Sequence, residues 1–227
     1  MSDWGFLYEN LASHGYIVVT LQHQLKTDSS SPKYSSILGK RNIGNYAKVI
    51  RNTHFVFKWL QDKNEVKFYN TLDLKRICLM GYSMGANAAK LLAQKAWYGH
   101  NVTLFPHDDK NNVKECVVAI DGRRVMFPYK KNIPLFLAIN GERETKQRGS
   151  GEYDVMKSLN IKFKHYKNTN HGSFIDHAYV NFPNVAMPDI FWYNGSTEER
   201  IAFFDELRQD ILDFLKENIG LYKIVSK

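Results

Sequence analysis

Cysteine is scarce in this sequence, because its 227 residues include only Cys78 and Cys116. A framework of several disulfides within the chain is therefore excluded, and two thiols are too few for a cysteine-rich metal site. Both cysteines lie in short apolar runs typical of strands, so we expect two buried thiols. A disulfide between them is the minor alternative, since neighbouring parallel strands rarely present the required geometry.

Long apolar runs are also missing. No stretch approaches the ~20 residues that a membrane-spanning helix needs, and the N-terminal segment MSDWGFLYENLASHG lacks the basic start and apolar core of a signal peptide. These absences favour a cytoplasmic protein, although a signal in a preceding segment stays open. No window is repetitive, and the length suits a single α/β domain over residues 1–227.

Charge of one sign is in excess: 31 Lys and Arg face 23 Asp and Glu, a net charge of +8. The basic residues are scattered and no binding motif accompanies them, so we expect no nucleic-acid partner. The excess favours solubility and weak attraction to anions. The more specific alternative is that the protein binds peripherally to an anionic lipid surface. The aromatic segment 180–195, with Phe191 and Trp192, is either core packing or a substrate wall or lipid-facing patch.

Short apolar runs alternate with helical patterns along the chain. We expect strands at Tyr16–Leu21, Arg76–Met80, Glu115–Ile120, Pro134–Ile139 and Ile161–Lys167. Helices are expected at 4–14, 42–64, 84–98 and 197–218, the last of them opened by a capping box of Ser196 and Glu199. This order predicts an α/β fold: a mostly parallel sheet with helices on both faces. Functional side chains are then expected where strands end.

The strongest motif is Gly81-Tyr82-Ser83-Met84-Gly85, which lies between a predicted strand and a helix rich in small residues. G-x-S-x-G in this setting is typical of the α/β-hydrolase fold, where a sharp turn exposes a nucleophilic serine. We therefore expect Ser83 to be the nucleophile and the Met84 N–H to be an oxyanion donor. Gly81 and Gly85 are expected to remove side chains that would clash. The alternative is a chance pattern in a loop.

Hydrolases of this kind supply their partners in the order serine, acid, histidine. His171 follows the last predicted strand in a turn, the correct place for the catalytic base, and His177 is the fallback. His165 lies inside a predicted strand and is expected to be structural or exposed. His100 and His107 precede a strand that follows Ser83, which breaks the order.

Two places qualify for the acid. Asp121 ends the strand CVVAI, and Glu142 and Glu144 follow the next strand. A carboxylate at either place could reach the imidazole of the histidine and fix its tautomer by a hydrogen bond. Geometry favours Asp121 but leaves the glutamates open; a turn or cap residue is the alternative for Asp121, and a solvated loop for the glutamates.

Five short segments, in order, resemble platelet-activating-factor acetylhydrolases and their bacterial relatives. They are Leu11–Val19, Gly81–Gly85, Ala119–Gly122 with Met126–Pro128, Ile133–Asn140 and Asn170–Asp176. The resemblance covers roughly residues 5–220 and implies an α/β-hydrolase fold with Ser83, Asp121 and His171 as the triad. It thereby favours Asp121 over the two glutamates.

The resemblance implies a serine ester hydrolase that forms an acyl-enzyme and needs no metal or organic cofactor. The family cleaves short or oxidised acyl chains from the sn-2 position of phospholipids without calcium, and many bacterial members are carboxylesterases. Dienelactone hydrolases and cutinases are similar in architecture, so the expected partner is a small-molecule ester or a phospholipid. Two other hypotheses remain: a binding protein with an incomplete oxyanion hole, and a peptidase of the same fold.

One departure from the family concerns the N-terminal strands. In the implied fold, the strand before Tyr16–Leu21 ends in a His-Gly-x-Gly-like loop that gives the second oxyanion N–H, and no such loop stands here. The usual strand order places that strand between Tyr16–Leu21 and Arg76–Met80. We therefore expect the N-terminal strands to be missing, with Tyr16–Leu21 either paired to Arg76–Met80 or separated from it by a groove. Losing one oxyanion donor costs on the order of 10²–10³ in kcat.

Overall fold

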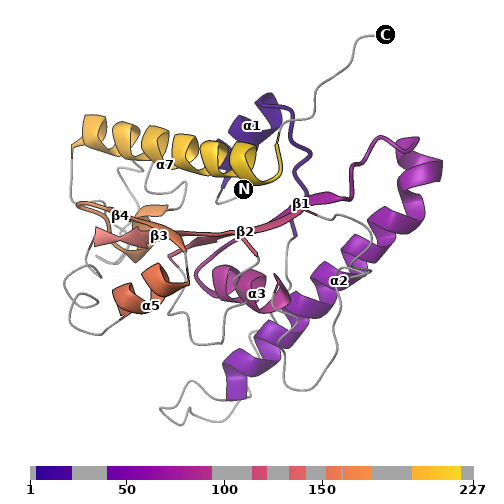
Figure 1. Ribbon diagram of the computed structural model, residues 1–227, viewed down its shortest axis with the longest axis horizontal. Coiled ribbons are helices and arrows are strands. Elements are labelled where there is room, and N and C mark those ends of the chain that lie inside the picture. The colour runs from indigo at the N-terminus through magenta and orange to yellow at the C-terminus, as the bar shows by residue number, and fades with distance from the viewer. Residues whose placement is uncertain are drawn as a thin grey trace, which may run out of the picture.

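The computed structural model describes residues 4–21, 40–93, 114–121, 133–141, 152–159, 161–174 and 196–220. Within these ranges, four parallel strands form one sheet in the order β1-β2-β3-β4 (Figure 1). Their bounds are Arg76–Tyr82, Lys114–Ile120, Leu135–Asn140 and Lys162–Tyr166. The predicted α/β class with a parallel sheet is therefore confirmed.

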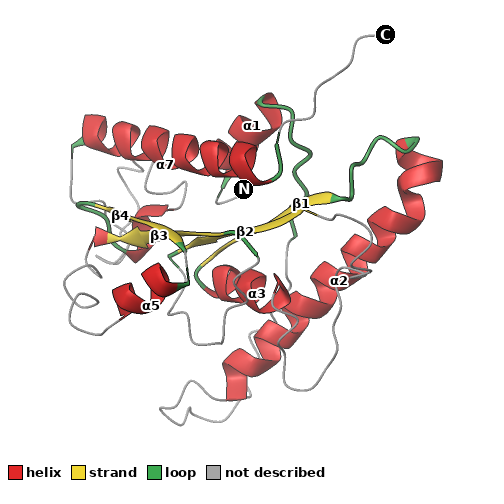
Figure 2. Cartoon of the chain, viewed as in Figure 1, coloured by secondary structure: helices red, strands yellow, loops and turns green. Residues whose placement is uncertain are grey.

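Helices cover both faces of the sheet (Figures 1 and 2). On one face lie α1 (Gly5–Ser13) and α7 (Thr197–Asn218); on the other lie α3 (Met84–Ala93), α5 (Glu152–Ser158) and α2 (Lys40–Phe68), which packs outside α3. A short 3-10 helix, η1 (His171–Phe174), follows β4. The sequence patterns predicted the helices except α5, and α2 extends beyond its expected end.

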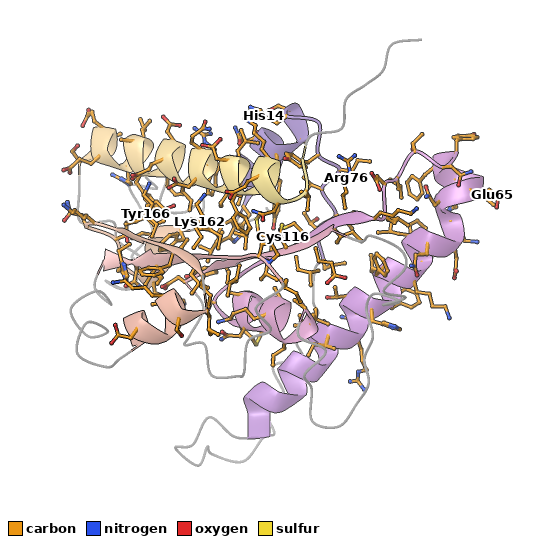
Figure 3. The ribbon with its side chains drawn as sticks, viewed as in Figure 1. His14, Glu65, Arg76, Cys116, Lys162 and Tyr166 are labelled. Atoms are coloured by element: carbon orange, nitrogen blue, oxygen red, sulfur yellow. The ribbon has the colours of Figure 1, made fainter. Side chains whose placement is uncertain are left out.

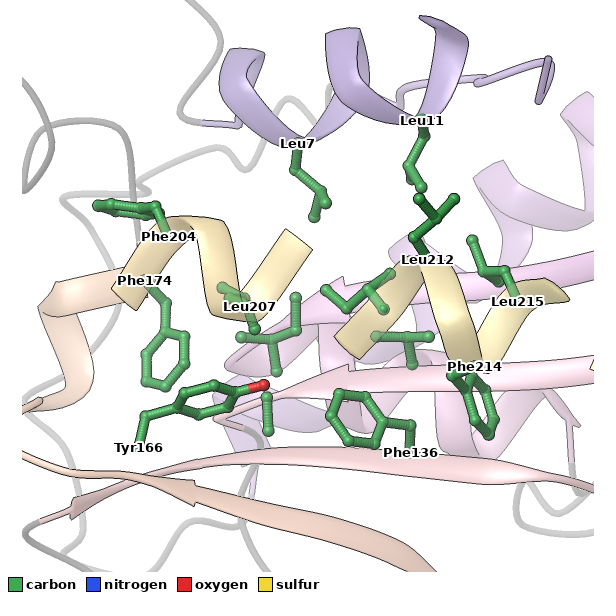
Figure 4. Packing of buried hydrophobic residues seen from close by; sticks show 14 of the residues in the cluster. Leu7, Leu11, Phe136, Tyr166, Phe174, Phe204, Leu207, Leu212, Phe214 and Leu215 are labelled. Carbon is green, nitrogen blue, oxygen red and sulfur yellow. The ribbon is translucent and has the colours of Figure 1, made fainter. Parts of the chain in front are cut away.

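The central strands β2 and β3 are buried on both faces, and their side chains alternate between two cores. Phe136, Cys116, Val118 and Ile120 face α1 and α7, where Leu7 and Leu11 of α1 pack against the aromatic and aliphatic face of α7 (Figure 4). Val117, Ala119, Leu135 and Leu137 face the alanines of α3 and Met156 of α5. This two-sided burial explains why both strands are continuous apolar runs in the sequence.

The ends of α7 are held by polar contacts. Its capping box forms as predicted: the Ser196 hydroxyl accepts from the Glu199 N–H, and the Glu199 carboxylate accepts from the Ser196 N–H. At the other end, Arg76 of β1 donates to the carbonyl of Ile219 over 3.3 Å (Figure 3). These contacts set α7 along the sheet, with its last turn beside the start of β1.

The predicted strand Tyr16–Leu21 is wrong: these residues form no regular secondary structure. Within the described residues, β1 is an edge strand and Tyr16–Leu21 does not pair with it. A cavity of about 620 Å³, lined by Tyr16–Leu21, β1, and parts of α2 and α7, lies there instead. A β-prone sequence becomes a strand only when a partner takes its backbone hydrogen bonds. Of the two expected outcomes, the groove is the one observed.

Both cysteines are free, as the sequence predicted, but only Cys116 is buried; Cys78, which was also expected to be buried, is half-buried. Cys78 of β1 lies opposite Cys116 of β2 in the parallel pair, and Cys116 is fully buried (Figure 3). Burial, together with the neighbouring Cys116 thiol, raises the pKa of Cys78 well above its usual value. The Cys78 thiol therefore stays protonated at neutral pH and acts as core packing rather than as a nucleophile.

Candidate active site

Ser83 occupies a sharp turn between the last residue of β1 and the first residue of α3. Its φ is +52°, a left-handed conformation that non-glycine residues seldom adopt. The turn brings the backbone of Gly85 onto Gly81, where a Cβ would lie 2.3 Å from the Gly85 carbonyl carbon. Only glycine fits at position 81, so this part of the G-x-S-x-G prediction is confirmed.

Gly85 does not behave as expected. A Cβ at that position would meet nothing within 4 Å, so no clash requires a glycine there. The two glycines differ because the main chain of Gly85 fills the space where a Cβ on Gly81 would lie, whereas a Cβ on Gly85 would point into open space. We call this arrangement one-sided crowding. The motif's second glycine is therefore not needed for the close approach.

Backbone hydrogen bonds continue the strand pairing one residue beyond the carboxyl ends of β1 and β2. The Ser83 N–H donates to the Ile120 carbonyl over 2.9 Å, and the Asp121 N–H donates to the Ala138 carbonyl over 2.7 Å. Asp121 also has a positive φ, +45°. Ser83 and Asp121 thus follow adjacent parallel strands at the same carboxyl edge, where such sheets gather their functional side chains.

Asp121 and His171 are in contact. The Nδ1 atom of His171, the first residue of η1, hydrogen-bonds to Oδ2 of Asp121, whose side chain is completely buried. A proton on Nδ1, donated to the carboxylate, leaves Nε2 as an acceptor. The His171 side chain is 39% exposed, so the ring spans from a buried carboxylate to the surface.

Asn140, the last residue of β3, is a site residue that the sequence analysis missed. Its side-chain amide donates to both oxygens of Asp121, each over 2.9 Å, and the residue is only 2% exposed. A buried carboxylate needs such donors to remain charged without a large desolvation cost. Asn140 ends the strand next to the one that Asp121 follows. This position at the carboxyl end of a parallel strand is the sequence signal that could have identified it.

Tyr82 connects the serine turn to the histidine. Its ring stacks on the imidazole of His171, with centroids 4.9 Å apart and planes 24° apart. Its hydroxyl donates to the main-chain carbonyl of His171 over 2.5 Å. The ring of Trp4 also lies near Tyr82, with centroids 5.5 Å apart. The residue beside Ser83 is thus bound to both the ring and the backbone of His171.

The turn that carries His171 is tied to the sheet by its own hydroxyls. Thr169 donates to the Tyr166 carbonyl over 2.6 Å and accepts from the Gly141 N–H over 3.2 Å. The Ser173 hydroxyl accepts from the Asn170 N–H over 2.9 Å. In the described structure no hydrogen bond joins the Ser83 hydroxyl to His171.

Met84, the expected oxyanion donor, is the first residue of α3, so its N–H has no partner within the helix. His165 lies in β4, half-buried, with its ring edge-on to Phe163, which agrees with the expected structural role. The remaining candidates lie outside the described residues: His100, His107, Glu142, Glu144, His177 and the segment 180–195.

Among the described side chains, no group of three or more His, Cys, Asp and Glu is placed to hold a metal ion. In the same part of the chain, every helix is too short or too polar to cross a membrane.

No protein-family model matches the sequence, and a comparison with curated proteins returns no match. Among solved structures, the chain is similar to a ferulic acid esterase from Streptomyces cinnamoneus, with a TM-score of 0.52 at 15% sequence identity. This chain has an α/β-hydrolase-like fold. The likeness covers 80% of the chain and 52% of the esterase, so the chain spans about half the length of that structure. At this identity, the likeness bears on the fold alone.

Proposed function

We propose that this chain is a serine carboxylic-ester hydrolase that acts through an acyl-enzyme. His171 takes the proton of Ser83 through Nε2, and the Ser83 oxygen attacks the ester carbonyl. The tetrahedral adduct then collapses, the ester C–O bond breaks, and the alcohol leaves with the proton that His171 returns to it. Asp121 holds the imidazole and stabilises its charged form. The Met84 N–H, at the start of α3, donates to the developing oxyanion. Water then releases the acyl group with the same base.

The observation that carries the proposal is the contact between the Nδ1 atom of His171 and the buried carboxylate of Asp121, next to a serine with positive φ. A histidine with its Nδ1 turned toward a buried carboxylate has the orientation that general-base catalysis needs. A non-glycine residue held at φ +52° stores strain, which is typical of functional turns. The fold likeness to the esterase named above is compatible with this reaction class as an analogy of fold.

For the substrate, we propose short-chain acyl esters, with the sn-2 acyl groups of phospholipids as the more specific candidates. Support comes from the five ordered segments that resemble platelet-activating-factor acetylhydrolases. The net charge of +8 also favours approach to anionic surfaces. The cavity beside β1 is not assigned to the acyl chain, because Ser83, Asp121 and His171 are not among its lining residues.

A fluorophosphonate probe tests the reaction class, because it reacts with activated serines. Wild type, Ser83→Ala and the control Ser13→Ala are treated with the probe and assayed on p-nitrophenyl acetate, butyrate and octanoate. Ser13 is an exposed residue of α1 whose hydroxyl donates to the Asn10 carbonyl, so its loss leaves the site untouched. We expect labelling and turnover in wild type and Ser13→Ala, and neither in Ser83→Ala.

Unlabelled wild-type protein, correctly folded by circular dichroism, would contradict the proposal and favour the binding protein with an incomplete oxyanion hole. Turnover of a peptide substrate but not of any ester would favour the peptidase. Turnover of a phosphatidylcholine with a short sn-2 chain, faster than of its long-chain analogue, would support the narrower substrate class.

A further inference from the structure

Tyr82 is the variable residue before the serine in the G-x-S-x-G motif, and nothing in that motif demands a tyrosine. Here its side chain makes two separate contacts with one residue, His171, which lies 89 positions further along the chain. The ring stacks on the imidazole and the hydroxyl binds the main-chain carbonyl. The proposed catalytic base is thus held by the neighbour of the proposed nucleophile.

The two contacts restrict different motions of His171. The hydrogen bond from the Tyr82 hydroxyl fixes the backbone at the start of η1, and the stacked ring limits the tilt of the imidazole plane. The bond from Nδ1 to Asp121 fixes rotation within that plane. Such restraints matter here because the imidazole is partly exposed and, among the strands that the structure describes, its turn follows the outermost one, β4.

Tyr82 also couples the two halves of the site mechanically. It is the last residue of β1 and is bonded covalently to Ser83, so a shift of His171 relative to the serine turn must disturb the stack or break the hydroxyl contact. A misplacement of about 1 Å between reacting groups is enough to cost roughly 100-fold in rate. A link of this kind therefore preserves the alignment of Ser83 and His171.

We propose that Tyr82 is a positioning residue that holds the imidazole of His171 in line with Ser83 by stacking on its ring and binding its backbone. This inference rests on the proposed function for its kinetic consequences, but its structural consequence, the ordering of His171, does not need turnover.

The test compares Tyr82→Phe, which keeps the ring and loses the hydroxyl, with Tyr82→Leu, which loses both. Tyr16→Leu is the matched control: Tyr16 is a partly buried tyrosine packed on the same core, and in the described structure no hydrogen bond or ring contact joins it to His171. The first readout is the downfield proton resonance of the His171 Nδ1–H, assigned by its loss in His171→Ala. The second is kcat and KM on p-nitrophenyl acetate.

We expect the Nδ1–H proton to exchange slowly with water in wild type and Tyr16→Leu, faster in Tyr82→Phe, and too fast to observe in Tyr82→Leu. We expect kcat to fall about fivefold in Tyr82→Phe, since one hydrogen bond is lost, and about 100-fold in Tyr82→Leu. KM should stay within about twofold in both, because a positioning residue does not touch the substrate.

A Tyr82→Phe protein whose Nδ1–H exchanges at the wild-type rate would overturn the proposal, and this variant decides the matter even if Tyr82→Leu does not fold. A rise in KM at unchanged kcat would overturn it too, because it would make Tyr82 a substrate-binding residue. If wild type hydrolyses no ester, the proposed function fails, but the proton-exchange measurement still judges the positioning role.

Discussion

The amide nitrogen of Asn140 lies 2.9 Å from both carboxylate oxygens of Asp121, so a single side chain donates hydrogen bonds to both oxygens of a buried carboxylate. The backbone N–H of Asn140 is also directed at Oδ1, over 3.4 Å. These donors replace water around a carboxylate that is completely buried. Asn140 therefore belongs to the site as a support for Asp121.

Replacing Asn140 with Leu should destabilise the protein by about 1–3 kcal/mol, because the buried carboxylate loses its amide donors. The free energy of unfolding in urea measures the loss. The control is the same change in an Asp121→Asn background, where no charge needs the donors and the cost should be smaller by at least about 0.5 kcal/mol. Equal costs in both backgrounds would show that Asn140 acts only through packing.

The two glycines of the serine turn should respond in opposite directions. Gly81→Ala places a Cβ 2.3 Å from backbone atoms of Gly85 and should cost about 1–3 kcal/mol or more. Gly85→Ala meets open space inside α3 and should be neutral or stabilise by up to about 1 kcal/mol. Urea unfolding of both variants measures the difference. A similar loss in the two would contradict the one-sided crowding.

Tyr16 carries a buried hydroxyl oxygen with no hydrogen-bond partner in the described structure. Tyr16→Phe should therefore stabilise the protein by about 1 kcal/mol, because an unsatisfied polar group is removed from the core. The matched comparison is Tyr166→Phe, which loses a 2.8 Å hydrogen bond to Asp210 and should cost about 2 kcal/mol. Thermal and urea unfolding of both variants check these signs. Loss of stability in Tyr16→Phe would mean that its hydroxyl is satisfied in solution.

Two tyrosines with raised pKa values predict a loss of stability at alkaline pH. Burial raises the pKa of Tyr16 to about 12, and burial with the nearby Asp210 carboxylate raises the pKa of Tyr166 further. In the unfolded chain a tyrosine releases its proton near pH ~10. The contribution of these groups is therefore complete below that pH and is lost as the pH rises toward the folded values.

Unfolding free energies measured from pH 8 to pH 11.5 test this. Wild type should lose stability steeply above pH ~10, and Tyr166→Phe should lose it less steeply. The control is Tyr69→Phe, which changes a tyrosine that is 83% exposed and should keep the wild-type slope. Identical slopes for Tyr166→Phe and wild type would contradict the prediction.

Several features were predictable because their causes lie within a few residues. The turn at Ser83 follows from a strand, a glycine at position 81 and a helix in one short segment. The capping box of Ser196 and Glu199 spans four residues. The buried strands β2 and β3 were recognisable as short apolar runs. The contact between Asp121 and His171 was predictable only through the general rule that parallel strands gather functional groups at their carboxyl ends.

Other features depended on neighbours that no local pattern specifies. Tyr16–Leu21 has the composition of a strand, but nothing in the described structure pairs with it, and a cavity lies where pairing was one of the expected outcomes. Helix α5 is too short for periodicity to show. Gly85 belongs to the motif, but whether a larger residue fits at position 85 depends on where an added Cβ would point in the folded turn.

The amino-acid sequence by itself determined the alternation of strands and helices, the turn that presents Ser83, and the positions of Ser83, Asp121 and His171 beyond the ends of strands, because these follow from local backbone preferences and side-chain patterns. Only the tertiary structure decided that Asn140 hydrogen-bonds to Asp121, that Tyr82 contacts His171, and that within the described ranges β1 has a partner strand on one side only. Each of these is a contact, or a missing contact, between residues distant in the chain, and such contacts exist only after the sheet and its covering helices have packed.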